Sequence, residues 1–178
     1  MKEWNIVATS LEGRQDALLM ALRKFGDFWR PRFRNVILGK VEDPGAFLDQ
    51  LKYQLEKDLL LPTALARALP VEKTFELHLD DLVDKLKHEL LPLVERIGRQ
   101  KFYVRMERRG LKGKIHSPTV EKEIGDFLWN ELHQRGFSPT VDFRDPDVVV
   151  TIEMAGEMAG IALIDRERRA KYPFLKVR

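Results

Sequence analysis

The sequence of 178 residues contains no cysteine. Structural disulfides and thiolate metal sites are therefore excluded, and an intracellular protein is the natural expectation. No apolar run approaches the length of a membrane span, and the first residues lack the apolar core of a signal peptide. We therefore expect a soluble, cytoplasmic protein that has no membrane partner.

Motifs of catalysis and metal binding are missing as well. There is no G-x-S-x-G nucleophile elbow, no P-loop and no G-x-G-x-x-G dinucleotide fingerprint. The four histidines (His78, His88, His116 and His133) form no metal pair on one helical turn. We therefore predict no catalytic residue, no metal and no cofactor, and we expect that the protein is not an enzyme.

Positive charge is present and is concentrated in two blocks. The net charge is only +3, yet residues 99–114 hold seven cations and one anion. Residues 165–178 hold six cations and two anions. Such local asymmetry favours an anionic partner, for which a phosphate backbone is the commonest choice. A merely solubilising surface is the alternative.

The first part of the chain alternates strand and helix patterns. No glycine-rich phosphate loop accompanies this alternation, so it favours a two-layer α+β sandwich over a doubly wound nucleotide fold. Strands are expected at 4–10, 28–38 and 73–77, helices at 12–25 and 43–55, and a short helix within 58–70.

A strongly amphipathic segment follows at 79–97, where apolar residues recur at spacings of three and four. Pro92 lies inside this pattern and removes one helical hydrogen bond. The segment is therefore either two helices that split at 90–92 or one kinked helix. We place a domain boundary just before it, which gives domains at 1–77 and 78–178.

The last third combines a strand, a basic loop, a helix and two further strands. Residues 101–109 alternate apolar and polar side chains, as in a half-buried strand. A basic loop follows, and Ser117-Pro118 opens a helix. The β-branched run 148–153 indicates an interior strand, 155–160 a turn, and 161–164 the returning strand.

This order resembles the THUMP domain, an RNA-binding module of tRNA-modifying proteins. The resemblance covers about residues 78–165 and implies an α-α-β-α-β-β layout, preceded by the ferredoxin-like α/β sandwich that commonly accompanies THUMP. The expected fold class is therefore α+β. The resemblance is carried by the strand and basic segment 102–114, Ile124-Gly125, Pro146-Asp147-Val148 and Gly160-Ile161.

Three groups of cations are candidates for RNA contact, because arginine and lysine grip phosphates. Alternatives remain: a solvated loop for the first group, and a sheet edge protected by charge for the third. Tyr172 and Phe174 either stack on unpaired bases or anchor the C-terminal tail. The basic loop patch comprises Arg105, Arg108, Arg109, Lys112 and Lys114, the C-terminal patch Arg166, Arg168, Arg169 and Lys171, and the arginine patch Arg30, Arg32 and Arg34 on one face of the expected strand.

The resemblance implies a protein that binds the acceptor end of tRNA. With no catalytic motif found, we expect a non-catalytic adaptor that presents tRNA to a separately encoded modifying enzyme. The architecture resembles that of a THUMP adaptor which presents tRNA to a cytidine acetyltransferase, so such an enzyme is a candidate partner. The alternative is a protein-interaction or regulatory module without RNA binding, in which the leucine-rich segment 59–69 and the helix from Leu79 bury a partner or a second copy. A small enzyme using unrecognised carboxylates is a third reading.

Overall fold

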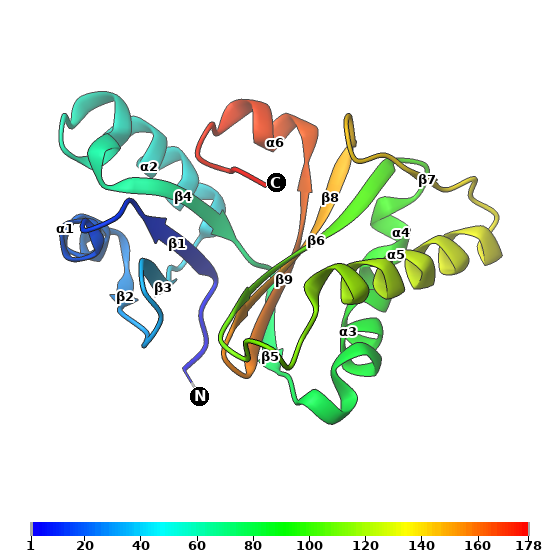
Figure 1. Cartoon of the computed structure of the whole chain (residues 1–178). Helices are drawn as coiled ribbons and strands as arrows, with labels where there is room; N and C mark the ends of the chain where they lie inside the picture. The colour runs from blue at the N-terminus through cyan, green and yellow to red at the C-terminus, as the bar shows by residue number, and fades with distance from the viewer. Residues whose placement is uncertain (1, 178) are drawn as a thin grey trace. The chain divides into compact units, whose positions relative to one another are not determined.

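A computed structural model describes residues 2–177 and contains two β-sheets with helices packed on them (Figure 1). The predicted α+β class is confirmed. The chain divides into two compact units. The first comprises residues up to Thr74 together with Arg168–Lys176, and the second is essentially Phe75–Glu167. The domain boundaries drawn at 77/78 from the sequence stay a prediction.

The first unit contains a four-stranded antiparallel sheet in the order β2-β3-β1-β4. Helix α1 buries Leu18 and Leu22, and α2 buries Phe47 and Leu51. The Phe47 ring lies 5.7 Å from that of Phe28 in β2, so α2 packs directly on the sheet. The elements are β1 (Ile6–Ser10), α1 (Gln15–Leu22), β2 (Asp27–Trp29), β3 (Val36–Lys40), α2 (Pro44–Lys57) and β4 (Leu65–Pro70), with 3-10 turns at Arg23–Phe25 and Leu61–Thr63.

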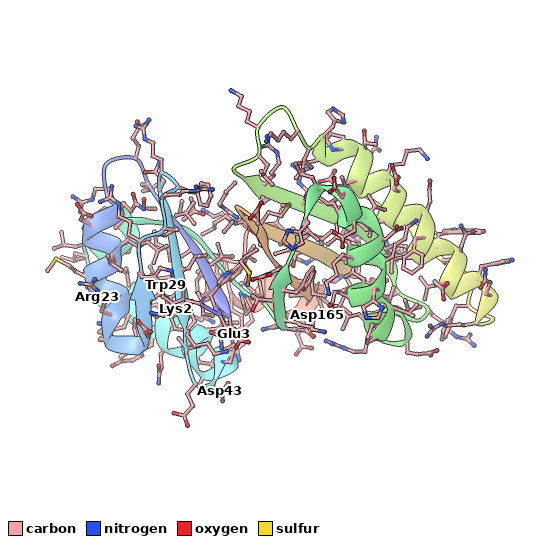
Figure 2. All side chains as sticks on the ribbon, turned by 90° about the horizontal axis from the view of Figure 1, so that it is seen from below. Lys2, Glu3, Arg23, Trp29, Asp43 and Asp165 are labelled. Atoms are coloured by element: carbon pink, nitrogen blue, oxygen red, sulfur yellow. The ribbon has the colours of Figure 1, made fainter. Side chains whose placement is uncertain are left out.

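Helix α2 begins where the sequence predicts. Asp43 (Figure 2) occupies the N-cap position, and its Oδ1 accepts a hydrogen bond from the amide of Ala46 at 3.1 Å. Pro44 takes the first helical position, where its missing N–H costs nothing. The start of this helix is therefore determined by local chemistry alone.

The single strand expected at 28–38 is wrong. The segment forms two antiparallel strands, β2 and β3, joined by residues 30–35. Pro31 has no N–H for a ladder, and Asn35 adopts the left-handed region with φ of 61°, so the chain turns here. Lys2 lies 4.0 Å from the centroid of the Trp29 ring at the edge of this hairpin (Figure 2).

The second unit contains the sheet β5-β9-β8-β6-β7, in which β6 is parallel to β7 and β8, and β8 is antiparallel to β9. The segment around Pro92 forms two helices separated by a 3-10 turn, so the split interpretation is confirmed. The elements are β5 (Lys73–Glu76), α3 (Leu82–Leu90), α4 (Val94–Ile97), β6 (Lys101–Arg109), α5 (Ser117–Gln134), β7 (Thr140–Val141), β8 (Val148–Ala155) and β9 (Met158–Asp165), with 3-10 turns at Leu79–Asp81 and Leu91–Leu93. Helix α6 (Arg166–Lys171) follows β9, and its residues from Arg168 onwards belong to the first unit.

The core of the second unit forms between the sheet and the buried stripes of α3 and α5. Leu86 of α3 and Ile124 of α5 join Val104 of β6 and Ile152 of β8 in one cluster. All eight residues of β8 are buried, as its β-branched sequence predicts. The turn expected at 155–160 is shorter, because β8 and β9 extend the ladder up to Ala155 and Met158.

One residue, Asp147, connects the ends of three strands of this sheet through its carboxylate and its backbone. Asp147 Oδ2 accepts a hydrogen bond from the amide of Lys101 at 2.8 Å, and Asp147 Oδ1 lies 3.1 Å from Arg166 Nη2. The amide of Asp147 donates to the carbonyl of Lys101, and the amide of Arg166 donates to the carbonyl of Asp147, both at 2.8 Å. The starts of β6 and β8 and the end of β9 are thereby joined at one residue.

Gly39 of β3 supports a test of sheet packing. A Cβ at this position would overlap the buried ring of Phe28 on the neighbouring strand, and that ring in turn packs against the ring of Phe47. We expect Gly39→Ala to lower the free energy of unfolding by about 1–3 kcal/mol. Gly125→Ala is the matched control, because no atom lies within 4 Å of its added Cβ and it should stabilise helix α5 by about 0.5–1 kcal/mol. Urea unfolding measures both, and equal effects would contradict the packing.

The aspartates around Asp147 predict acid sensitivity. The pKa of Asp147 is lowered by the Lys101 amide and by Arg166, and the pKa of Asp145 is lowered by Arg166 and Lys101. A carboxyl whose folded-state pKa is lowered contributes stability above its unfolded pKa of about 3.9 and loses it as pH falls through the folded value. Urea midpoints measured from neutral to acidic pH should therefore fall below about pH 4. Arg166→Gln should reduce the amplitude of that fall, and an unchanged profile in the variant would remove Arg166 from this role.

Candidate nucleic-acid interface

The basic loop patch begins at the end of β6 and continues into residues 110–116. Gly110, Leu111 and Gly113 all have positive φ, which coils the loop tightly. Lys112 and Lys114 are exposed on it. Within residues 2–177, neither lysine forms an ion pair with a carboxylate. Both ammonium groups are therefore available to an anionic ligand.

Arg109 has a different environment from these two lysines. Its Nη1 lies 2.7 Å from Glu153 Oε2, and the side chains are only 12% and 2% exposed, respectively. Glu153 belongs to β8, next to β6 in the sheet. The two charges balance each other inside the second unit, so little of the Arg109 charge reaches the solvent.

The environments of Arg105 and Arg108 are intermediate between those of the exposed lysines and that of the buried, paired Arg109. Arg105 Nη1 is 3.7 Å from Glu121 Oε1, and the same oxygen accepts the amide of Met106 at 2.8 Å. Arg108 donates to the carbonyl of Gly110 and so braces the loop. In the described part of the chain no carboxylate pairs with Arg108. Its charge adds to those of the two lysines.

The C-terminal patch is divided between the two units. Arg166 belongs to the second unit and pairs with Asp145 and Asp147. Lys171 belongs to the first unit, where its Nζ lies 3.1 Å from Asp49 Oδ1. Arg168 and Arg169 are half-buried on α6.

The C-terminal tail packs on the first unit. The Tyr172 hydroxyl donates to Asp49 Oδ1 at 2.5 Å, and the pKa of Asp49 is lowered chiefly by this bond and by Lys171. The carbonyl of Phe174 accepts from the amide of Ala68 in β4 at 3.1 Å. Both aromatic rings are buried, so of the two interpretations of Tyr172 and Phe174 the structure shows anchoring of the tail.

The arginine patch lies on the connection between β2 and β3 and not on the face of a strand. Arg30 Nη1 lies 2.8 Å from Asp16 Oδ1, and Arg34 pairs with Glu12. Arg32 is exposed, with its guanidinium 5.4 Å from the centroid of the Phe33 ring.

Sequence reasoning missed the residue that positions this connection. Gln15 is buried, and its Nε2 donates to the carbonyls of Val36 at 2.7 Å and Phe33 at 3.4 Å. Its Oε1 accepts the amide of Asn35 at 3.3 Å. A glutamine near the start of the predicted helix 12–25 was the available signal, but its partners lie about twenty residues away.

A hollow of about 360 Å³ lies where the N-terminal ends of α3 and α5 meet, and Lys114 and His116 line it. Lys87 lines it as well, and so do the acidic residues Asp80, Asp81, Asp84 and Glu123. Among residues 2–177 there is no group of three or more histidine and acidic side chains that could hold a metal ion.

The sequence of residues 78–163 matches the THUMP domain family. The THUMP domain predicted from the sequence is thereby confirmed, and the match supports RNA binding and a place in tRNA modification. No curated protein is significantly similar to this sequence.

Solved structures share the fold over most of the chain. TrmN from Thermus thermophilus is 21% identical, with a TM-score of 0.64, and the match covers 90% of this chain and 45% of TrmN. A 4-thiouridine synthetase complexed with RNA and ATP is 18% identical, with a TM-score of 0.56 and coverage of 91% and 41%. SMU.472, assigned as a methyltransferase and complexed with SAH, is 18% identical, with a TM-score of 0.51 and coverage of 93% and 42%. The chain thus spans less than half the length of these proteins.

The expectation that the protein is not an enzyme is corrected by these structures. The fold is shared with a 4-thiouridine synthetase and with an assigned methyltransferase, so the comparisons point towards the enzymatic THUMP proteins. The match covers only part of each of them, and motifs missing from these residues therefore do not argue against catalysis. In the described chain, no helix is long and apolar enough to cross a membrane.

The Arg109–Glu153 pair predicts a large and asymmetric effect on stability. Arg109→Met should cost about 3–5 kcal/mol, because it removes the cation that lies 2.7 Å from a carboxylate only 2% exposed. Arg109→Met combined with Glu153→Leu should recover most of that loss, since the charge is then removed altogether. Arg30→Met is the control: it breaks an exposed ion pair and should cost at most about 1 kcal/mol. If urea unfolding shows similar losses of unfolding free energy for Arg109→Met and Arg30→Met, the buried pair contributes no more to stability than the exposed one.

Proposed function

We propose that this protein binds tRNA and presents the acceptor end to the catalytic centre of a tRNA-modifying enzyme. The observation that carries the proposal is the THUMP domain at residues 78–163, whose loop exposes Lys112 and Lys114 without an acidic partner in the described chain. Lysines bind phosphates as mobile point charges, which suits an RNA backbone.

We infer further that the first unit is the ferredoxin-like domain that commonly precedes THUMP. Its element order is β-α-β-β-α-β, and its sheet is antiparallel throughout with the order β2-β3-β1-β4. Two interlocked β-α-β units with this order are the ferredoxin-like arrangement. In this proposal the ferredoxin-like and THUMP domains meet near residue 77.

The RNA-contacting residues in the proposal follow from charge and exposure. Arg108, Lys112 and Lys114 make the first contacts, because no carboxylate balances them within residues 2–177. Arg32 serves the same role on the first unit. Four further cations form exposed ion pairs with an aspartate or glutamate: Arg30, Arg34, Arg166 and Lys171. Each of them can exchange its carboxylate for a phosphate at a small cost in free energy, because exposed ion pairs contribute little to stability. Arg105, Arg168 and Arg169 complete the proposed set. Arg109 supports this set indirectly, because its ion pair with Glu153 holds the end of β6 in place.

The proposal concerns the binding step. A separately encoded tRNA-modifying enzyme is the proposed recipient of the tRNA, and the resemblance to THUMP adaptors suggests a cytidine acetyltransferase. The same binding step serves equally well a catalytic domain that is joined to this fold. Holding the RNA end near a reactive centre raises its effective concentration there and orients it for reaction.

The test is binding of the purified protein to labelled tRNA, intact or trimmed of its single-stranded 3′ end, across a salt series. Affinity should fall steeply with salt and should fall further on trimming. Lys112→Gln combined with Lys114→Gln should flatten the slope of log affinity against log salt by about 1.5, since each phosphate contact contributes about 0.7–0.9.

Lys122→Gln is the matched control, because Lys122 is an exposed lysine of the same unit whose charge is already paired with Asp126 at 2.8 Å. It should leave the slope unchanged. An unchanged salt slope for the variant with both Lys112→Gln and Lys114→Gln would show that the loop does not contact the RNA. Absence of binding even at low salt would refute tRNA binding and leave the protein-interaction module as the better account.

A further inference from the structure

The first unit exposes an apolar patch that its fold does not need. Three large hydrophobic side chains, Leu11, Met20 and Leu60, are exposed around Ala64, and a fourth exposed one, Leu59, directly precedes Leu60 in the chain. Met20 and Leu60 line the same hollow as Ala64, and the amide of Leu11 donates to the Ala64 carbonyl at 2.8 Å. Helix α1 and the connection from α2 to β4 thus contribute to one surface (Figure 1). Clustered apolar side chains of this kind mark interaction sites.

Local hydrogen bonds hold the leucines of this patch in place. Helix α2 ends at Lys57, and Asp58 Oδ1 then accepts the amides of Leu60 at 2.8 Å and Leu61 at 3.2 Å. This turn sends Leu61 into the core and leaves Leu59 outside, 89% exposed. The apolar side chain is therefore presented on a braced turn, which reduces the entropy that a partner has to remove on binding.

The shape of the patch is complementary to itself. Leu59 is 89% exposed and stands in the chain between Asp58 and Leu60, which both line a hollow of about 250 Å³ together with the small residues Ala17, Ala21 and Ala64. In an interface with two-fold symmetry the same patch meets itself, so a projection on one chain meets the hollow of the other. Leu59 of each copy can thus enter the hollow of its neighbour.

The charges at the rim also match a second copy. Arg14 and Asp58 both line the hollow and have opposite signs. In a two-fold interface through this hollow, Arg14 of each chain can face Asp58 of the other.

We propose that the protein forms a two-fold dimer through this patch, with a second copy of the chain as the occupant. A contact made by these few side chains should be weak, with a dissociation constant in the micromolar range. None of the twelve candidate RNA-contacting cations belongs to the patch. The dimer is therefore independent of tRNA binding and is tested without RNA.

The test is sedimentation equilibrium of the nuclease-treated full chain, from about 10 to 500 µM in high salt. The average mass should rise with concentration from the monomer value of 20.8 kDa towards twice that value. High salt should not abolish the rise, because the contact is mainly apolar. Leu59→Glu and Met20→Glu should each weaken association at least tenfold, since they place a charge in the contact.

Phe143→Glu is the matched control: Phe143 is 75% exposed, like Met20 at 74%, but it belongs to the second unit. It should dimerise like the original chain. Circular dichroism checks that each variant folds, and Leu59→Ala removes the projection without adding a charge if Leu59→Glu does not fold. A constant monomer mass up to the highest concentration overturns the proposal, as does a dimer that Leu59→Glu leaves intact.

Discussion

The bonds of Asp147 to the start of β6 and the end of β9 are the constraint on which the second unit depends. Strands β6 and β8 are parallel, so no tight turn sets their register. The amide and carbonyl of Lys101 pair with Asp147, and this pairing sets that register at the first residue of β6. A slip of one residue would turn Val104 and its apolar neighbours away from the core and would move Arg109 away from Glu153.

The fold determines how much of the positive charge is available to a ligand. Counting cations along residues 99–114 overstates the field of this segment, because Glu121 and Glu153 return from distant parts of the chain to balance Arg105 and Arg109. Only the cations that Glu121 and Glu153 do not neutralise are available to bind a phosphate. Exposed pairs can exchange partners cheaply, whereas breaking the Arg109–Glu153 pair costs several kcal/mol, about 3–5. The loop after β6 therefore matters more than the number of arginines before it.

The correction about enzymatic activity has a simple physical origin. Function depends on the site and not on the fold, and a search for motifs reports only on the residues that it covers. The shared fold makes up 41–45% of TrmN, the 4-thiouridine synthetase and SMU.472. The missing motifs are therefore compatible with a tRNA-binding part of an enzyme, in which binding geometry and chemistry reside in different segments.

The sequence by itself determined the features that neighbouring residues decide. Asp43-Pro44 starts α2, Pro92 splits the helical segment, the β-branched run forms β8, and the pattern of residues 78–163 identifies the THUMP domain. Only the tertiary structure decided the contacts between residues far apart in the chain. These include the Gln15 bonds to the β2–β3 connection, the packing of Arg168–Lys176 with the first unit, and the acids that balance the candidate cations. Periodicity and capping act within a few residues, whereas ion pairs and packing depend on where the whole chain folds back.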